Sequence, residues 1–256
     1  MPTIKESLYF NYDGKSCRDF GLINVNLDGG MFEETLVASR AINETRVRGS
    51  DTPLFHSIDE EPLELQLSIA FKSTFTEEDV DGIIMWLFQD KYKPLYFEDK
   101  PHKVFYCMPI GDSIIAHNGL KQGYISINMR CRSSKIESPQ NVTSTYHSNS
   151  SSDTVVMIEN IGHVEIFPEI SIEKTGNGNV TIMKDGEIFE IRNLTNGEKI
   201  YINTEKEIIE TDITGVYRYE DVVGDYFDMA LSVGENTFTV RGSCKIAFRY
   251  RFKYRF

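Results

Sequence analysis

The chain has 256 residues, of which 40% are hydrophobic and 26% charged, and its formal net charge is −12. This apolar content excludes a disordered chain, and the length predicts one large domain or two modest ones. Both halves carry an excess of six acidic residues, which excludes nucleic-acid binding as the main task.

The sequence carries no signal for export or membrane insertion. It has neither a cationic, apolar amino-terminal leader nor a run of about 18 apolar residues, so we expect neither secretion nor a membrane span. The cysteines lie far apart without a C-x-x-C pair, which predicts reduced, buried thiols and a reducing cytoplasm. They are Cys17, Cys107, Cys131 and Cys244.

Residues 31–49, MFEETLVASRAINETRVRG, form a long and weakly patterned stretch with few turn residues. Two interpretations remain open for it, an extended hairpin and a plain surface loop. The residues alone do not decide between them.

Three segments alternate apolar and polar residues, which predicts strands with one buried face. They cover residues 63–71, 124–132 and 227–233. The apolar positions are Leu63, Leu65, Leu67, Ile69 and Phe71, then Ile125, Ile127, Met129 and Cys131, then Phe227, Met229, Leu231 and Val233. Turn residues between the later segments favour an antiparallel sandwich or jelly roll.

Residues 76–89 are predicted to form one helix. Thr76 stands at the N-cap with Asp79 three residues later, as in a capping box. The acidic residues 77–79 suit the positive end of the helix dipole, and we prefer this interpretation to a metal site. One apolar stripe follows at helical spacing, made of Val80, Ile83, Ile84, Leu87 and Phe88.

A composition change divides the chain into two domains. Residues 138–153 are rich in Ser, Thr and Asn and are predicted to be a linker. The predicted domains therefore cover residues 1–137 and 154–256.

The last twelve residues, KIAFRYRFKYRF, combine aromatic and basic residues in an acidic chain. Stacking on nucleic-acid bases is one interpretation. We prefer a strand whose basic residues pair with acidic neighbours across a sheet, while the other face enters the core. The apolar positions are Ile246, Phe248, Tyr250, Phe252, Tyr254 and Phe256, and the basic ones are Lys245, Arg249, Arg251, Lys253 and Arg255.

No motif for catalysis is present. The sequence has no phosphate-binding loop, zinc-protease motif, nucleophile elbow or calcium loop. Acidic residues are abundant, so a carboxylate pair for glycoside hydrolysis stays open, but nothing requires one. We expect no enzyme, no catalytic or metal-binding residues and no cofactor.

Three parts of the sequence together resemble siphophage distal tail proteins. The stretch NETRVRGSDTPLFHSIDEEPLELQLSIAF is similar to that family's Arg-x-x-Gly-x-Asp-like turn before an alternating strand, and it contains Gly49 and Asp51. The helix and the following KPLYFEDKPHKVFYCMPIG are similar to its helix, apolar strand and Asp-x-Pro turn. The matching residues are Trp86, Leu95, Phe97, Asp99, Pro101 and Tyr106. From IENIGHVEIFPEISI to the final strand, the second half resembles its galectin-like domain.

The resemblance implies a mainly β fold with two antiparallel β-sandwich domains. Residues 1–137 would form the ring-building domain, related to tail tube proteins and carrying the helix at 76–89. Residues 154–256 would form a galectin-like or jelly-roll domain.

The resemblance also implies a structural role in the virion. Such a protein forms a homo-hexameric ring at the end of a long non-contractile tail, joining the tail tube protein to the tail-tip or tail-associated protein. Its second domain can carry receptor-binding proteins, and DNA passes only as cargo through the channel. We expect assembly in the host cytoplasm and no membrane partner. In such a ring the hairpin at 31–49 would reach a neighbouring subunit, with Arg46 and Arg48 as candidate interface charges.

Two rival functions remain. One is a carbohydrate-binding module acting in adhesion, which would stack sugar rings on exposed aromatics. The other is a glycan-degrading enzyme with two converging carboxylates. The aromatic candidates for the first are Tyr201, Tyr217, Tyr219 and Tyr226.

Overall fold

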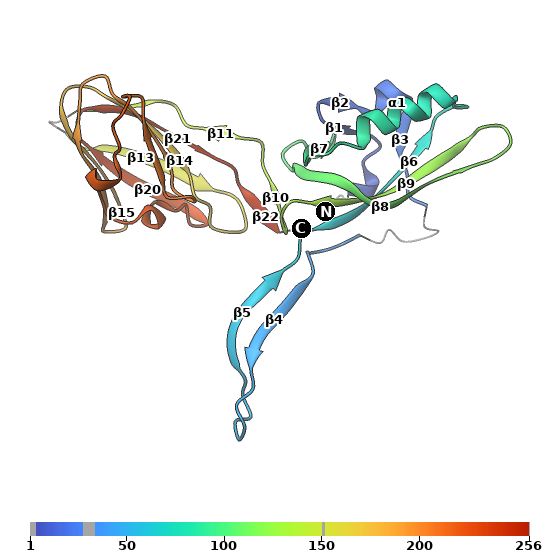
Figure 1. Ribbon diagram of the computed structural model, residues 1–256, viewed down its shortest axis with the longest axis horizontal. Coiled ribbons are helices and arrows are strands. Elements are labelled where there is room, and N and C mark those ends of the chain that lie inside the picture. Colours follow the sequence, from blue (N-terminus) through green and yellow to red (C-terminus); the bar gives the residue numbers. More distant parts are fainter. Residues whose placement is uncertain (1–3, 28–33, 150–151, 256) are drawn as a thin grey trace. The chain divides into compact units, whose positions relative to one another are not determined.

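The computed structural model describes residues 4–27, 34–149 and 152–255 (Figure 1). The chain divides into two compact units, one ending at Glu137 and including Arg255, the other covering Ser138–Tyr254. The predicted mainly β fold, with antiparallel sheets and one packed helix, is confirmed. A galectin-like identity for the second unit stays a prediction.

The first unit is built on one seven-stranded sheet with the order β2-β1-β7-β8-β9-β6-β3, antiparallel at every step. The strands predicted at 63–71 and 124–132 are confirmed as β6 and β9, and their alternating apolar side chains enter the core. The bounds are β1 Phe10–Tyr12, β2 Lys15–Ser16, β3 Leu22–Asn24, β6 Glu64–Phe71, β7 Lys93–Phe97, β8 Phe105–His117 and β9 Gly123–Cys131. Two 3-10 turns, η1 Ile4–Glu6 and η2 Cys17–Phe20, complete this unit's amino-terminal part.

The helix α1, Glu77–Leu87, confirms the predicted element and its capping box. The Thr76 hydroxyl accepts a hydrogen bond from the Asp79 backbone N–H, and the Asp79 carboxylate accepts one from the Thr76 backbone N–H. The predicted apolar stripe was placed partly on the wrong face. Ile83 and Leu87 are buried, but Ile84 and Phe88 are exposed.

Trp86 takes the central place on the buried face of α1. Its indole Nε1 donates to the Tyr12 carbonyl oxygen over 2.8 Å, and its ring stacks on Phe20 with a centroid separation of 4.3 Å. Phe10 stacks near the same indole at 5.8 Å. The helix is therefore held to the sheet by aromatic packing with its one polar atom satisfied.

Two further strands of the first unit lie outside this sheet. β4, Arg40–Thr45, and β5, Leu54–Glu60, pair with each other as an antiparallel ribbon. Figure 1 shows this ribbon extending away from the seven-stranded sheet, and we call it the arm. The predicted stretch 31–49 is thus an extended hairpin from residue 40 onward, while residues 31–33 lie outside the described part of the chain.

The second unit has two antiparallel sheets. One has the order β11-β21-β14-β17-β18, with β12 also paired to β21, and the other has the order β13-β20-β15-β16-β19. Phe238 of β20 and Phe248 of β21 meet with ring centroids 4.9 Å apart, so the core lies between the two sheets. The bounds are β11 Asn141–Val142, β12 Tyr146–Ser148, β13 Thr154–Asn160, β14 Glu169–Lys174, β15 Gly178–Lys184, β16 Glu187–Leu194, β17 Lys199–Asn203, β18 Ile208–Thr211, β19 Val222–Val223, β20 Gly234–Arg241 and β21 Cys244–Tyr250. This unit also contains the 3-10 turns η3 Tyr219–Asp221 and η4 Tyr226–Met229. The remaining strands of the chain are β10 Lys135–Glu137, at the end of the first unit, and β22 Lys253–Arg255.

The aromatic-basic segment forms strands, as predicted, and the longer of them lies inside its sheet. Most of it is β21, which lies between β14 and the short strands β11 and β12. Lys245 lies opposite Glu173 and donates to it over 2.9 Å, and Arg249 lies opposite Glu169 and forms an ion pair with it. The aromatic face enters the core, while Phe256 lies outside the described residues. The basic side chains are therefore matched across the sheet.

Two sequence predictions differ from the structure. The segment 138–153 was expected to be a linker, but β11 and β12 within it pair with β21, while residues 150–151 lie outside the described part. The strand predicted at 227–233 is wrong, because η4 occupies its first half and leaves Phe227 exposed. The Asp225 carboxylate accepts a hydrogen bond from the Phe227 backbone N–H and starts this turn, so local capping overrides the alternation.

The four cysteines are free and buried, as predicted. Burial raises the pKa of the Cys244 thiol to about 11, and it also raises the pKa of Cys107. Both thiols are therefore protonated and unreactive near neutral pH.

A buried ion pair fixes the segment between β18 and β19 to the sheet. The Arg218 guanidinium donates to both oxygens of Glu198, each over 2.9 Å, and also binds Asp221. Thr211 donates to the same Glu198 carboxylate over 2.7 Å. Burial by itself raises the pKa of Glu198, but these hydrogen bonds, that of Arg218 foremost, outweigh it and hold the pKa below its usual range.

We predict that Glu198→Gln lowers the free energy of unfolding by about 3 kcal/mol, because the buried Arg218 loses its bidentate carboxylate partner and keeps only the ion pair with Asp221. Urea denaturation followed by circular dichroism at neutral pH measures this loss. The control is Glu187→Gln, which changes an exposed carboxylate and should leave the midpoint unchanged.

The same pair predicts a pH dependence. A carboxyl whose pKa is depressed in the folded state stabilises the fold above its unfolded value, about 4.3, and the contribution is lost as pH falls through the folded pKa. The stability gap between the wild type and Glu198→Gln should therefore narrow below about pH 4. A gap of constant size down to pH 3 would contradict this assignment.

Candidate functional site

The arm exposes apolar side chains that a single copy of the chain leaves uncovered. Every residue of β4 is exposed, and Ile42, Phe55 and Ile58 have exposed fractions of 65%, 57% and 40%. Ile42 lies directly opposite Ile58, and Phe55 lies opposite Glu44 beyond a register shift. Because opposed residues share a face and alternate residues of β4 point the same way, these three side chains form one stripe.

The tip of the arm contains four of the residues singled out in the sequence. Arg46, Arg48, Gly49 and Asp51 all lie between the end of β4 and the start of β5, and all are exposed. Gly49 has a φ of 90°, which a side chain would disfavour, so this turn needs glycine. The structure thus brings both candidate interface arginines to the end of a projecting ribbon.

The root of the arm is held by Glu60. Its carboxylate receives hydrogen bonds from the Lys135 ammonium and from the Ser134 hydroxyl, the latter over 2.9 Å. Arg40, directly opposite on β4, approaches the same carboxylate to 3.5 Å. The Lys135 and Ser134 hydrogen bonds hold the pKa of Glu60 below its usual range. The arm is therefore fixed at its base and unsupported beyond it.

The other residues that carry the family resemblance lie in the first unit, away from the arm. Trp86 belongs to the core, as described above. Asp99 and Pro101 lie exposed in the connection between β7 and β8. Tyr106 lies on β8, where the Arg132 guanidinium sits 4.1 Å from its ring centroid. The structure does not bring this group together with the arm tip.

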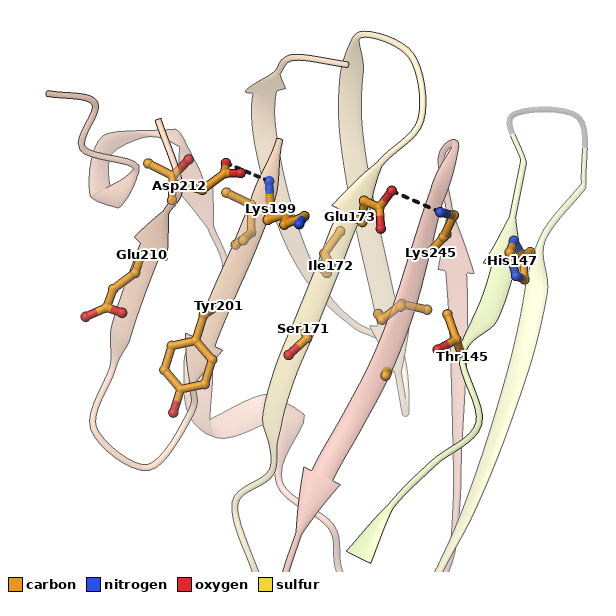
Figure 2. A pocket seen from close by; sticks show the side chains of 14 residues that line it. Thr145, His147, Ser171, Ile172, Glu173, Lys199, Tyr201, Glu210, Asp212 and Lys245 are labelled. Atoms are coloured by element: carbon orange, nitrogen blue, oxygen red, sulfur yellow. Dashed lines mark hydrogen bonds and ion pairs between the residues drawn. The ribbon is translucent and has the colours of Figure 1, made fainter. Parts of the chain in front are cut away.

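The second unit carries a hollow of about 780 Å³ on the outer face of its β11-β21-β14-β17-β18 sheet (Figure 2). Ser171 of β14 lies between Ala247 of β21 and Tyr201 of β17, so two small side chains leave space beside an aromatic one. Glu210 of β18 stands next to Tyr201. We call this depression the sheet-face hollow.

A row of charged residues borders the sheet-face hollow along one rung of the sheet. His147, Lys245, Glu173 and Lys199 lie in register across β12, β21, β14 and β17. Asp212 follows them and accepts a hydrogen bond from the Lys199 backbone N–H over 2.9 Å. From Lys245 through Glu173 and Lys199 to Asp212 the signs of charge alternate, so the rim offers both hydrogen-bond donors and acceptors without a strong net field.

Of the tyrosines considered for sugar binding, one lines this hollow. Tyr217 and Tyr219 are exposed elsewhere, and Tyr226 is partly buried with its ring 5.1 Å from that of Phe189. Tyr201 is half-buried, and its ring faces the hollow in Figure 2. The structure thus selects one of the four candidates.

Sequence reasoning missed the apolar stripe of the arm, its root at Glu60 and the floor of the hollow. Strand register creates all three, since it decides which distant residues become neighbours. The only signal in the sequence was the pair of apolar residues Ile42 and Ile58 within otherwise polar stretches.

The structure shows no metal centre in its described ranges. Among residues 4–27, 34–149 and 152–255, no three His, Cys, Asp or Glu side chains are grouped so that they could hold a metal ion. Within the same ranges, no helix has the length and apolar character needed to cross a bilayer.

Sequence comparison finds matches over both units. Residues 5–133 match a family described as phage tail protein N-terminal domain, and residues 137–250 match one described as phage tail C-terminal domain. The SPbeta prophage-derived uncharacterized protein YomH of Bacillus subtilis (strain 168) is 30% identical over 255 residues. This likeness covers 98% of this chain and 99% of YomH.

Solved structures show a similar fold. The Dit protein of SPP1, described as a paradigm of the hub adsorption apparatus in phages that infect Gram-positive bacteria, gives a TM-score of 0.69 at 16% identity. The likeness covers 96% of this chain and 99% of that chain. A chain of the phage p2 baseplate in its activated conformation with Ca gives a TM-score of 0.49 at 8% identity, covering 95% and 97% of the two chains.

We predict that Glu60→Gln loosens the arm at its root, because the neutral amide loses the charge-assisted hydrogen bond to Lys135. Hydrogen exchange measured by mass spectrometry should become roughly tenfold faster in peptides covering β4 and β5. Glu61→Gln alters the exposed neighbouring residue and serves as the control. Unchanged exchange in the Glu60→Gln variant would show that the root does not depend on this carboxylate.

Proposed function

The chain belongs to the phage tail protein family that matches both of its halves, and we infer from this that it is a structural protein of the virion. The resemblance to siphophage distal tail proteins, stated from the sequence, is confirmed by the family match and the shared fold. We propose that six copies form a ring at the distal end of a long non-contractile tail. This hub would join the tail tube protein to the tail-tip protein.

The observation that carries this proposal is the arm. A two-stranded ribbon is marginally stable alone in water, and its open edges and apolar stripe invite pairing with another chain. Ile42, Phe55 and Ile58 have no second layer to cover them within the described chain. We propose that the neighbouring subunit supplies that layer.

Such a contact is of the kind that closes into rings. The arm of one copy would meet a different surface on the next, which makes a heterologous contact, and repetition of the same rotation closes the ring. The outer side of α1 is one candidate acceptor, because Ile84, Met85 and Phe88 are exposed there. The arm and α1 both belong to the first unit, which we propose as the ring-building domain.

The composition supports passage of DNA through this ring. The net charge of −12 would disfavour binding of phosphates by the channel wall, so DNA would pass as cargo. We propose that the ring assembles in the host cytoplasm and that the second unit carries the receptor-binding components. No catalytic role is proposed.

We predict that the double variant Ile42→Asp/Ile58→Asp is impaired in self-assembly. Two isoleucines that become buried contribute together about 3 kcal/mol, so the assembly constant should fall by about a hundredfold. Size-exclusion chromatography with light scattering over a concentration series measures this. Val155→Asp, an exposed apolar position of β13, is the control that should assemble normally. Assembly of the arm variant at wild-type concentrations would contradict a role for the stripe.

We also predict that reversing Arg46 and Arg48 to Glu weakens assembly several-fold, because rim charges at an interface contribute modestly. The effect should shrink at high salt, which screens exposed charges. Sedimentation velocity at low and high salt tests this. Reversal of the exposed Arg192 and Lys206 in the second unit gives the same net charge and serves as the control. Equal assembly of both double variants would show that Arg46 and Arg48 do not contribute to the interface.

A further inference from the structure

The sheet-face hollow has the size of a small-molecule site and lies apart from the arm. Its volume of about 780 Å³ is within the range of ligand pockets in proteins. Its floor is made by Ser171 and Ala247, which lie directly opposite each other on β14 and β21. Thr145 and Tyr201 also line the hollow, and Figure 2 shows them on either side of Ser171.

Tyr201 supplies an aromatic wall that is held in place. Asn203 donates to its hydroxyl at 3.5 Å, and the Arg249 guanidinium lies 5.8 Å from its ring centroid. The ring face is electron-rich and attracts the weakly positive C–H groups of a flat apolar surface. A pyranose ring presents such a surface on one side and hydroxyl groups at its edge.

The rim matches those hydroxyl groups. The charged row places the Lys245 and Lys199 ammonium groups on either side of the Glu173 carboxylate along the rung, and Glu210 and Asp212 add carboxylates on the side of β18. A hydroxyl group can donate to a carboxylate and accept from an ammonium at the same time. Rows of alternating donors and acceptors therefore suit a ligand rich in hydroxyl groups.

Other ligand classes fit this surface less well. Glu173, Glu210 and Asp212 offset the charges of Lys199 and Lys245, so the hollow has no excess of positive charge that would favour a nucleic acid or a polyphosphate. A protein partner would require an apolar centre, but the isoleucines Ile172, Ile200 and Ile246 beneath the hollow are buried in the core.

We propose that the sheet-face hollow binds neutral oligosaccharides, with Tyr201 stacking on a sugar ring and the Lys199, Glu173 and Lys245 row binding its hydroxyl groups. The site lies wholly within the second unit and makes no use of the arm. It therefore stands independently of the ring, and it would give a tail protein a direct contact with surface glycans.

The test uses the full chain on a glycan array of neutral oligomers of glucose, galactose and N-acetylglucosamine, followed by calorimetric titration of the saccharide bound most strongly. Tyr201→Ala should weaken binding at least about tenfold, since it removes the stacking surface. Ser171→Gln fills the floor while Tyr201 remains, and it should weaken binding to a similar extent. Tyr217→Ala changes an exposed tyrosine outside the hollow and should bind as the wild type does.

Circular dichroism and light scattering on the same variants separate loss of the site from loss of the fold or of assembly. The arm variant Ile42→Asp/Ile58→Asp should keep full saccharide binding, so that failure of the ring and failure of the site are distinguishable. Absence of binding to all these neutral oligomers would overturn the proposal. So would binding that is unchanged by both Tyr201→Ala and Ser171→Gln, or binding that is restricted to anionic polymers.

Discussion

A ribbon of two strands has no second layer against which to bury a side chain, and this constraint governs the arm. Ile42, Phe55 and Ile58 are exposed to water in the single chain. The hydrogen bonds between β4 and β5 stabilise such an isolated hairpin only marginally. The carboxylate of Glu60 fixes the root of the ribbon and leaves the rest projecting. The arm therefore presents an apolar surface that is free to meet another molecule, and we propose that a second copy of the chain supplies the missing layer.

The second unit differs from the arm, because its two sheets bury their apolar side chains against each other and the outer face of one sheet is polar. β21 lies inside its sheet because Lys245 and Arg249 are matched by Glu173 and Glu169 on β14. The pairing of Lys245 with Glu173 also forms part of the row of alternating charge that continues to Lys199. Where small residues interrupt the outer face beside Tyr201, the row borders a hollow. Fold stability and the proposed glycan contact thus share the same cross-strand pairs.

Sequence patterns predicted the elements whose signal is local and strong. The strands β6 and β9 and the helix α1 follow from period-two alternation and from the Thr76–Asp79 capping box. The 227–233 segment failed because the Asp225 cap outweighed an equally regular alternation. The segment 138–153 failed as a linker because its strands are held by backbone pairing with β21, which polar composition does not reveal. The arm stripe and the hollow depend on register, so the sequence offered only Arg46 and Arg48 at the tip of the arm and Tyr201 at the hollow as isolated candidates.

We propose that copies of this chain close into a six-fold ring through their arms. Negative-stain imaging of the largest species purified at high protein concentration tests this proposal. The wild type should form six-fold rings with an open centre. Particles without a central opening, or a chain that remains monomeric at every concentration, would contradict it.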